Sequence, residues 1–457
     1  MNNTFLQLVL KEDDSLSNQL NEYIVNINPS LIHHWKIDLA KPVFLSIGQT
    51  IVPVTIQTTS AESKQMLVSS NLIINAKLPL PCSHFLAQFI SKTQTICLGP
   101  IIAILTEIRE AKDGEAPFRS LSALYNELSQ EITAMGGIVY VFGLQGFSTD
   151  HISGFTLRDN KWVQMKLPFP TVVYNRLHSR KLDSSLLFQQ VQSHLEEMHI
   201  PIFNARFFSK YDTHLLLKKD VHLQKHLPET HPLTKQTLET MLKKYSSLYI
   251  KPIHGSQGRN IIYITEAEEG YAASISTGRQ KNKKRLFPHL DQLWSWLQPF
   301  SQKRAYLCQQ GIDFLKINQC PLDFRILCHK NYYDEWKATS LIARVANPNA
   351  FVANLAQGAE TFQAKTVVQE LFGKEDTSRL LAQLKKLAIE TATIITEHSN
   401  GHFGEMGIDI GLDAHLNLWI IEANSKPSKN IEQQSKKSRP STKALLEYFI
   451  RLSFPNK

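Results

Sequence analysis

The sequence predicts a protein of the mixed α/β class that is built from several domains. Three observations lead to this prediction. The chain has 457 residues, of which 42% are hydrophobic and 20% are charged, so it can bury more than one core. Short apolar runs separated by polar turns fill the first part of the chain, which is typical of a small β-rich domain. From Thr95 onward, strand-like and helix-like segments alternate, which is typical of a parallel α/β unit.

Residues 1–94 are predicted to form the β-rich domain. Their apolar runs are short and are separated at the spacing expected for strands. No motif in this region indicates a ligand, so its role is open between recognition of a partner or peptide and simple packing on the rest of the chain. The apolar runs cover residues 4–10, 43–45, 51–56, 66–68 and 72–74.

Residues 95–209 are predicted to form a parallel α/β domain. A helix is expected over residues 118–135, and the pair Gly136-Gly137 ends it. Two prolines, Pro168 and Pro170, mark the start of the last predicted strand. The predicted strands cover residues 101–105, 139–143 and 171–175.

A third region extends from residue 210 to about 430. A strand is predicted over residues 247–252, where it leads into a glycine-bearing loop. A helix is predicted over residues 380–398 because apolar residues recur at the i, i+3, i+4 spacing, and Asn400-Gly401 ends it. The tail, 431–457, is polar and basic at first and amphipathic near its end.

A hairpin of two apolar strands, residues 404–413 and 418–424, carries the strongest chemical signal. Symmetric pairing places residue 410 opposite 421 and 412 opposite 419, so Asp409 falls opposite Glu422. Like charges directly opposite each other destabilise an antiparallel pair, so a cation is expected between these two carboxylates. Asn424 lies on the same face, two residues beyond Glu422. Carboxylate and amide oxygens without His or Cys suit Mg²⁺, with Mn²⁺ as the alternative ion.

The alternative interpretation of the hairpin is a sheet edge that carries solvated acids. The flanking residues are Ile408, Ile410 and the run Trp419-Ile420-Ile421, which favour a buried pair of strands. Unpaired carboxylates are costly in such surroundings. The metal site is therefore the preferred interpretation.

A second signal is the strand that ends at Lys251, followed by a loop that contains Gly255, Ser256 and Gly258. Backbone N–H groups in such a loop can surround a phosphate, and glycine allows close approach. Two glycines alone are a weak signal, since any turn can contain them. The sequence does not match a Walker loop or a dinucleotide-binding fingerprint.

Three further polar residues lie in apolar surroundings. Arg325 follows Asp323 at the start of an apolar strand, where the alternative is a surface ion pair. Arg344 lies inside an apolar strand and must meet an anion, either a carboxylate or a phosphate. Asn354 precedes a glycine turn, where a packed loop asparagine is the default interpretation. Together with the lysine, the glycine loop and the hairpin, these residues indicate a site for Mg²⁺ and a polyphosphate.

Composition argues against several other classes of protein. The five cysteines form no CxxC pair and have no zinc-ligand spacing, so a reduced, cytoplasmic protein is expected. No signal peptide is visible, and the longest apolar run, 96–105, is too short to span a bilayer, so no membrane partner is expected. The net charge of +9 suits anionic ligands. The dense basic runs, 279–285 and 436–439, lack interleaved aromatics and are interpreted as solvated loops rather than as a nucleic-acid site.

The order of these motifs resembles the ATP-grasp superfamily. More closely, the chain resembles the YheC/YheD family, which is described as endospore coat-associated proteins of spore-forming bacteria. The matching segments span most of the chain. They are residues 98–100, 172–176, 203–204, 226–230, 250–259, 323–325, 343–358 and 404–426.

The resemblance implies an α/β (α+β) chain with an ATP-grasp fold, preceded by the parallel α/β domain and the N-terminal β-rich domain. Two subdomains, about 210–308 and 309–430, would close over ATP. Lys210 and Lys251 would contact the phosphates, and the glycine loop would form a flap over them. Arg344 and Asn354 would face the γ-phosphate or an acyl phosphate. The hinge that reads adenine would be Gln309, Gln310, Gly311 and Ile312.

The implied activity is that of an ATP- and Mg²⁺-dependent carboxylate–amine ligase that acts through an acyl phosphate, with a peptide or amino-acid substrate. One departure from many ligases is visible, since Ser425-Lys426-Pro427 follows the metal set where small residues and glycine are usual. The alternatives are a coat-associated structural protein that retains the ATP-grasp shell without turnover, and a kinase-like phosphotransferase. Association with the spore coat rests on the resemblance alone.

Overall fold

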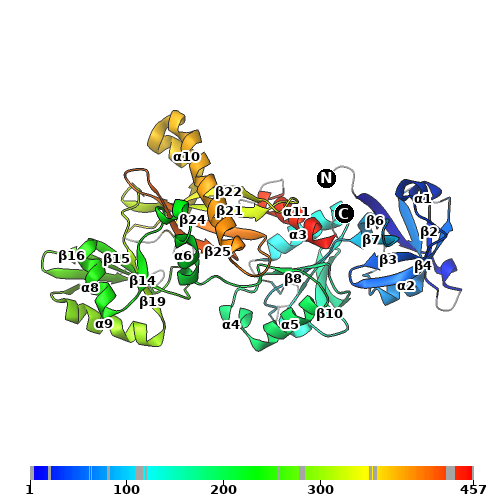
Figure 1. The fold of residues 1–457 in the computed structure, drawn as a ribbon, viewed down its shortest axis with the longest axis horizontal. Helices are drawn as coiled ribbons and strands as arrows, with labels where there is room; N and C mark the ends of the chain where they lie inside the picture. The colour runs from blue at the N-terminus through cyan, green and yellow to red at the C-terminus, as the bar shows by residue number, and fades with distance from the viewer. Residues whose placement is uncertain are drawn as a thin grey trace.

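The structure is a computed structural model with four β-sheets arranged in a row (Figure 1). The N-terminal barrel lies at one end of the elongated molecule, and a sheet covered by two helices lies at the other (Figure 1). The described residues are 5–18, 22–60, 62, 64–79, 83–109, 117–118, 121–255, 258–276, 284–348, 353, 358–428 and 438–454. Within them, no helix is both long enough and apolar enough to cross a membrane.

The N-terminal strands form a closed barrel in the order β1-β5-β2-β4-β3-β7-β6. Strand β7 pairs with β6 and β3 and closes the barrel, so the β-rich region extends to Gly99 instead of ending at 94. Helices α1 (Pro29–Trp35) and α2 (Ser70–Asn75) connect barrel strands. The strands are β1 (Leu6–Glu12), β2 (Ile24–Ile27), β3 (Val43–Ile47), β4 (Thr50–Thr58), β5 (Gln65–Val68), β6 (Ser83–Ile90) and β7 (Thr95–Gly99).

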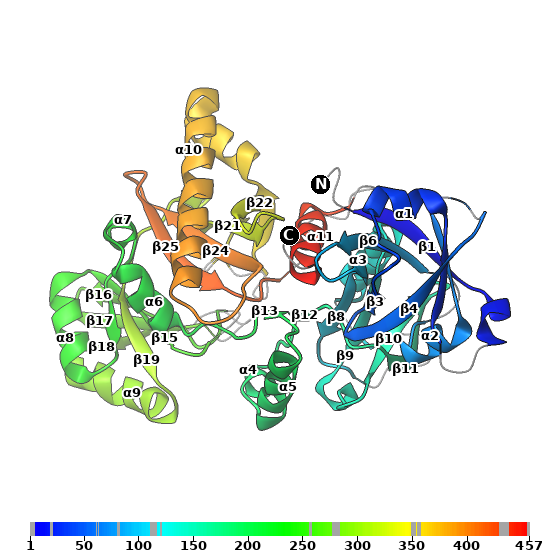
Figure 2. The ribbon, with the colours of Figure 1, turned by 45° about the vertical axis from the view of Figure 1, so that its right-hand side comes forward.

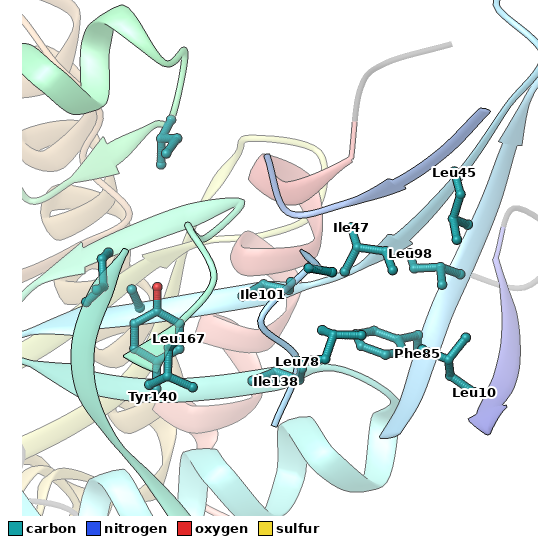
Figure 3. Close-up of a cluster of buried hydrophobic side chains, with 14 of the residues drawn as sticks. Leu10, Leu45, Ile47, Leu78, Phe85, Leu98, Ile101, Ile138, Tyr140 and Leu167 are labelled. Carbon is teal, nitrogen blue, oxygen red and sulfur yellow. The ribbon is translucent and has the colours of Figure 1, made fainter. Parts of the chain in front are cut away.

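The second sheet has the strand order β11-β10-β9-β8-β12-β13. Strands β9, β8, β12 and β13 are parallel, as predicted, and an antiparallel hairpin that the sequence analysis does not predict extends the β9 edge. Figure 3 shows that barrel side chains such as Leu98 and side chains of this sheet such as Tyr140 belong to one buried cluster. The elements are β8 (Ile101–Leu105), α3 (Ser122–Met135), β9 (Ile138–Phe142), β10 (Ile152–Arg158), β11 (Lys161–Leu167), β12 (Val172–Asn175), α4 (Arg180–Asp183), α5 (Leu186–Glu197) and β13 (Ile202–Phe203).

The third and fourth sheets are both antiparallel. The third has the order β14-β19-β15-β16-β17-β18, and the fourth has the order β23-β22-β21-β24-β25, with β20 (Lys316–Ile317) beside β21. The third contains β14 (Thr230–Pro232), β15 (Ser247–Pro252), β16 (Ile262–Ala267), β17 (Gly270–Ile275), β18 (Lys284–Phe287) and β19 (Tyr306–Gln310), with helices α8 (Lys235–Lys244) and α9 (Leu290–Lys303). The fourth contains β21 (Cys320–Lys330), β22 (Trp336–Val345), β23 (Glu360–Gln363), β24 (Glu405–Leu412) and β25 (Leu418–Asn424).

Helices α6 (Lys210–Lys218) and α7 (Val221–Gln224) connect the second sheet to the third, and α10 (Ala364–Glu397) packs on the fourth sheet (Figure 2). The helix predicted over 380–398 is part of α10, which begins earlier and is interrupted at Gly373, where φ is 78°. Its apolar face, including Leu384 and Ile395, belongs to the core beneath the fourth sheet.

The C-terminal helix α11 (Pro440–Ser453) lies within the predicted tail, 431–457, and packs into the folded core. It lies between α3 and the fourth sheet (Figure 2). Its buried Leu445, Tyr448 and Phe449 join the core on one face of the second sheet. The physical reason is its amphipathic pattern, since the apolar stripe needs a partner surface to exclude water.

A buried ion pair joins the second sheet to the fourth. Arg176, just after β12, donates to Glu405 of β24 at 2.6 Å and to the carbonyl of Pro427 at 3.0 Å. Both side chains of the pair are fully buried. Asn204 adds hydrogen bonds to the backbone of Glu405 and Ser425. Because β24 also carries Asp409, this junction fixes one wall of the site described below.

Replacing Gly404 with Ala is expected to lower the free energy of unfolding by about 1–3 kcal/mol, since overpacking of a core has this cost. A Cβ atom at this position would lie 2.3 Å from the ring of Tyr448 and 3.0 Å from the ring of Phe203. Urea unfolding measures the change. If the clash is the cause, Tyr448→Ala lowers the free energy of unfolding less in the Gly404→Ala background than in the wild type. An equal decrease in both backgrounds would refute this explanation.

Candidate functional site

A cleft of about 960 Å³, open to solvent, lies between the third and fourth sheets. One wall comes from β15, the loop after it and β19, and the other comes from β21, β22, β24 and β25. Lys210, the first residue of α6, also lines the cleft. The pieces come from segments more than 200 residues apart in the chain, so only the folded protein brings them together.

The hairpin of β24 and β25 pairs Asp409 with Glu422, as the sequence predicts. The register of the other pairs differs from the prediction, since residue 410 pairs with 420 and 412 with 418. An irregularity after Asp409 leaves Ile421 without a partner in the ladder, and Ile421 lines the cleft. A β-bulge of this kind places two residues opposite one and changes the direction of side chains next to a site.

Four charged side chains form a continuous row across the fourth sheet. Arg344 lies opposite Asp323, and Arg325 lies opposite Asp409. Arg344 binds Asp323 through two hydrogen bonds of 2.6 and 2.7 Å, and it also lies 3.1 Å from Asp409. Arg325 binds both oxygens of Asp409, with Nη2 at 2.7 Å from Oδ2. The interpretation of Asp323 and Arg325 as a surface ion pair is therefore wrong, because both are buried and each has a partner on a neighbouring strand.

The two arginines control the charge of Asp409. Burial raises the pKa of this carboxyl group, but the charges of Arg325 and Arg344 outweigh burial and hold the pKa below its usual value. Burial raises the pKa of Asp323 despite its bond to Arg344. Asp409 is thus the member of the row that is held ionised, next to Glu422.

Asp409 and Glu422 also have cationic partners within the protein, and the expected metal site between them stays a prediction. Each carboxylate has its own cation, since Asp409 pairs with the two arginines and Glu422 pairs with Lys210. The side chain of Glu422 is 27% exposed, because β25 is the edge strand of the sheet. The interpretation as a buried strand pair therefore fits Asp409, and the interpretation as a solvated sheet edge fits Glu422.

The residues here fit a magnesium ion by their chemistry. Among the described residues, no group of three or more His, Cys, Asp or Glu side chains is close enough to hold a metal by itself. Mg²⁺ typically uses one or two carboxylates together with phosphate oxygens from a bound substrate. Asp409 and Glu422 supply the two carboxylates, and the half-buried Asn424 lies two residues beyond Glu422 on the edge strand.

Lys251 stands at the end of β15 and faces the same cleft. Its ammonium group donates to Oε1 of Gln309 at 2.5 Å and lies 5.1 Å from the ring centre of Tyr249. Burial, followed by the charge of Lys210, lowers the pKa of Lys251 to about 8. The cleft therefore contains a lysine with no carboxylate partner among the described residues, which is suited to an anionic ligand.

The loop after β15 contributes Gly255 and Gly258 to the cleft. Gly258 has a φ of 67°, which disfavours any residue with a Cβ atom. A Cβ atom on Gly255 would lie 2.7 Å from the ring of Pro252, so glycine also allows the loop to pack on the strand end. Ser256 lies outside the described residues.

The end of β19 and the residues after it form another part of the cleft wall. Gln309, Gln310 and Ile312 line it. The backbone N–H of Gly311 donates to the carbonyl of Ser247 at 2.9 Å, and a Cβ atom there would lie 2.1 Å from Oγ of Ser247. Gly311 thus holds the segment against β15 and does not itself line the cleft.

The structure brings most of the predicted site residues into one place. Three of them do not line the cleft, namely Arg325, Gly311 and Asn424. Asn354, like Ser256, falls outside the described residues. The predicted residues that line the cleft are Lys210, Lys251, Gly255, Gly258, Gln309, Gln310, Ile312, Arg344, Asp409 and Glu422.

Several residues that line the cleft have no distinguishing pattern in the sequence. Arg259 follows the glycine loop directly, and its charge beside two glycines could have been noticed. Tyr249, Phe314 and Ile421 are apolar or aromatic residues in apolar segments, where core packing is the default interpretation. Their position in the cleft depends on the pairing of strands that are distant in the chain.

Comparisons with known proteins agree with the motif order. A family model described as "YheC/D like ATP-grasp" matches residues 199–452. The chain is 29% identical over 375 residues to the endospore coat-associated protein YheD of Bacillus subtilis, and the match covers 80% of each chain. It is 22% identical over 270 residues to the endospore coat-associated protein YheC of the same bacterium, covering 59% of this chain and 73% of that one.

Similar solved structures include D-alanyl-alanine synthetase A from Vibrio cholerae, with a TM-score of 0.46 and 13% identity over 78% of this chain and 98% of that one. The ATP-grasp ligase PsnB in complex with a minimal precursor has a TM-score of 0.43 and 12% identity over 78% of this chain and 99% of that one.

Proposed function

Because the chain belongs to the YheC/D-like ATP-grasp family, we propose that it is an ATP- and Mg²⁺-dependent ligase that joins a carboxylate to an amine through an acyl phosphate. The substrates are amino acids or peptides. The observation that carries the proposal is the composition of the cleft. Three cations, Lys210, Lys251 and Arg344, share one cavity with the oxygen donors Asp409 and Glu422.

The cations of the cleft serve the phosphates of ATP. Lys251 has no carboxylate partner among the described residues, and Lys210 would be available to a phosphate if Glu422 held a metal ion. Arg344, held by Asp323 and Asp409, stabilises charge on the transferred phosphoryl group without having to reorganise. Asp409, Glu422 and Asn424 would hold Mg²⁺, which would supply neutralisation of phosphate charge.

The reaction has two steps in this proposal. A substrate carboxylate attacks the γ-phosphorus, which gives an acyl phosphate and ADP, and an amine then attacks the acyl carbon and releases phosphate. Phosphoryl transfer of this kind needs positioning and charge neutralisation more than covalent chemistry from the protein. The glycine loop and Asn354 act at the phosphates, and Gln309, Gln310 and Ile312 hold the adenine end.

A second candidate is a coat-associated protein that retains the ATP-grasp shell without turnover. The observation in its favour is that both curated relatives are named endospore coat-associated proteins. The cleft argues for turnover, because a shell without chemistry has no need of Asp409, Glu422 and Lys251 in one cavity.

The experiment that tests the proposal is phosphate release from Mg·ATP in a mixture of amino acids and peptides, with hydroxylamine added to trap an acyl phosphate as a hydroxamate. Phosphate release that needs the mixture, together with hydroxamate formation, is the expected result. Nucleotide binding with neither product would favour the structural candidate. A phosphorylated product without hydroxamate would indicate a kinase.

The affinity for Mg·ADP is expected to fall as the pH rises through about 8, because the pKa of Lys251 in the nucleotide-free protein is about 8 and the side chain loses its proton there. A bound phosphate favours the protonated form of Lys251. Above this pH, the lysine must therefore gain a proton when the nucleotide binds, and this lowers the affinity. In the Lys251→Arg variant the guanidinium stays charged, and the affinity is expected to be nearly constant between about pH 7 and 9. Calorimetry in buffers of different ionisation enthalpy measures both effects. If the affinity of the variant fell with pH as that of the wild type does, this role of Lys251 would be contradicted.

A further inference from the structure

Helix α4 follows β12 of the second sheet and lies below the centre of the molecule in Figure 2. It is a single turn that carries Arg180. This side chain does not line the cleft, but Glu422 is the carboxylate that acts most strongly on its charge, followed by Asp183. The carbonyl that accepts from Arg180 belongs to Phe208, two residues before Lys210, and Lys210 pairs with Glu422. Arg180 therefore lies near the edge of the cleft that Lys210 and Glu422 form.

The guanidinium group of Arg180 is held in place but not neutralised. One of its N–H groups donates to the carbonyl of Phe208 at 3.1 Å, and the group lies over the ring of Phe207 at 4.6 Å. No described carboxylate forms an ion pair with it, and burial lowers its pKa. Guanidinium has five N–H donors in a planar fork, so most of them remain for a ligand.

The nearby carboxylate, Asp183, is already occupied. Its Oδ1 accepts from Lys426 at 2.5 Å and from Asn175 at 2.9 Å, and its Oδ2 accepts from the backbone of Phe207 at 3.1 Å. Lys426 also lies 4.6 Å from the ring centre of Phe207, on which Arg180 stacks. The group of two cations and one carboxylate around this ring therefore has one positive charge in excess.

The turn that carries Arg180 is fixed at both ends. Ser179 caps it by accepting from the backbone of Leu182, and the backbone of Ser179 donates to Glu107 at 2.6 Å. Asp183, at the other end, is tied to Lys426, which follows β25. A group held in this way binds its ligand without a large loss of freedom.

Apolar surface adjoins Arg180 along the chain. Leu182, Leu186 and Leu187 are 38%, 70% and 36% exposed. Leu182 and Leu187 line a hollow of about 1160 Å³ at the carboxyl ends of β8 and β9. The order of strands reverses at β8, and ligands of open α/β sheets bind at such a reversal. The surface beside α4 thus continues over the loops that follow β8 and β9.

We propose that Arg180 binds the carboxylate of the acyl substrate and that this substrate is a peptide, whose chain lies on the leucines beside α4. The inference rests on the proposed function. Arg180 would hold the substrate carboxylate near Lys210 and Glu422, the residues proposed to bind the phosphates and the metal. Its approach to the negatively charged phosphates needs a cation on the side of the second sheet, and Arg180 provides it.

The test is affinity selection in the presence of Mg·ADP, with a mixture of N-acetylated pentapeptides that contain Asp or Glu. The same mixture after methyl esterification has no carboxylate charge. The wild type is expected to retain peptides from the free mixture and not from the esters. In Arg180→Gln, retention is expected to fall by about tenfold to a hundredfold, since a charge-assisted hydrogen-bonded pair is lost. Arg180→Lys is expected to be intermediate.

The matched control is Lys181→Gln, which removes an exposed charge from the same turn and is expected to retain peptides as the wild type does. Thermal unfolding checks that both variants are folded, and Mg·ADP titration checks the nucleotide site. The inference would be overturned if Arg180→Gln retained as much peptide as the wild type. It would also be overturned if the wild type retained the esters as well as the free peptides, or retained no peptide at all. Weakened binding of a non-hydrolysable ATP analogue by Arg180→Gln would also overturn it, by showing a phosphate contact. Failure of the wild type to bind Mg·ADP would instead refute the proposed function.

Discussion

Replacing Glu422 with Gln is expected to slow ATP turnover on the order of 10³-fold, as the loss of one strong electrostatic contact in an active site does. Glu422 is the more exposed of the two hairpin carboxylates, and Lys210 is its partner in the structure. The amide keeps the size of the side chain but loses the charge that would hold Mg²⁺ and balance Lys210. The variant is therefore expected to bind Mg²⁺ more weakly without unfolding.

Phosphate release measures the turnover, and electron paramagnetic resonance of Mn²⁺ in the presence of ADP measures the metal affinity independently. Glu360→Gln is a suitable control, because Glu360 is exposed on β23 and does not line the cleft. Near-normal turnover and Mn²⁺ affinity in Glu422→Gln would refute the assignment of this residue to the metal.

The second large effect concerns stability. Replacing Arg176 with Met is expected to lower the free energy of unfolding by about 3–5 kcal/mol, because it removes the arginine from the buried charge of Glu405 and leaves His329, at 3.5 Å, beside it. Tyr174 and Asn204 also contact Glu405 or its backbone, so the loss reaches the whole junction between the second and fourth sheets. Urea denaturation measures the change.

Two controls separate the effect of leaving a buried charge at Glu405 from the general effect of removing an arginine. Arg304→Met removes an exposed charge and is expected to change the free energy of unfolding by less than about 0.5 kcal/mol. The double variant Arg176→Met with Glu405→Leu removes both charges and is expected to recover much of the stability. A single variant as stable as the wild type, or a double variant that is less stable than the single one, would contradict this explanation.

Local patterns in the sequence were sufficient to predict the elements that they determine alone. The helical period within α10, the apolar strands of the second sheet and the pairing of Asp409 with Glu422 are examples. The bulge at Ile421 was not predictable in this way, since symmetric pairing is the default for a hairpin. The hairpin of β10 and β11 and the closure of the barrel by β7 depend on contacts with other parts of the sheet.

For the site, residue type indicated the chemistry but not the partners. An arginine inside an apolar strand had to meet an anion, and Arg344 meets Asp323 and Asp409. The pairing of Lys210 with Glu422 joins residues 212 positions apart, and no local pattern encodes it. Arg180 gave no signal either, because its significance depends on the charges that surround it in the folded chain.

The central claim is that the cleft between the third and fourth sheets binds a magnesium nucleotide. Calorimetric titration of the wild-type protein with ADP, in the presence of Mg²⁺ and again in the presence of EDTA, tests it most directly. Micromolar affinity that is lost with EDTA is the predicted result. The absence of binding under both conditions would contradict the claim, and the charges of Asp409 and Glu422 would then serve only their ion pairs with Arg325, Arg344 and Lys210.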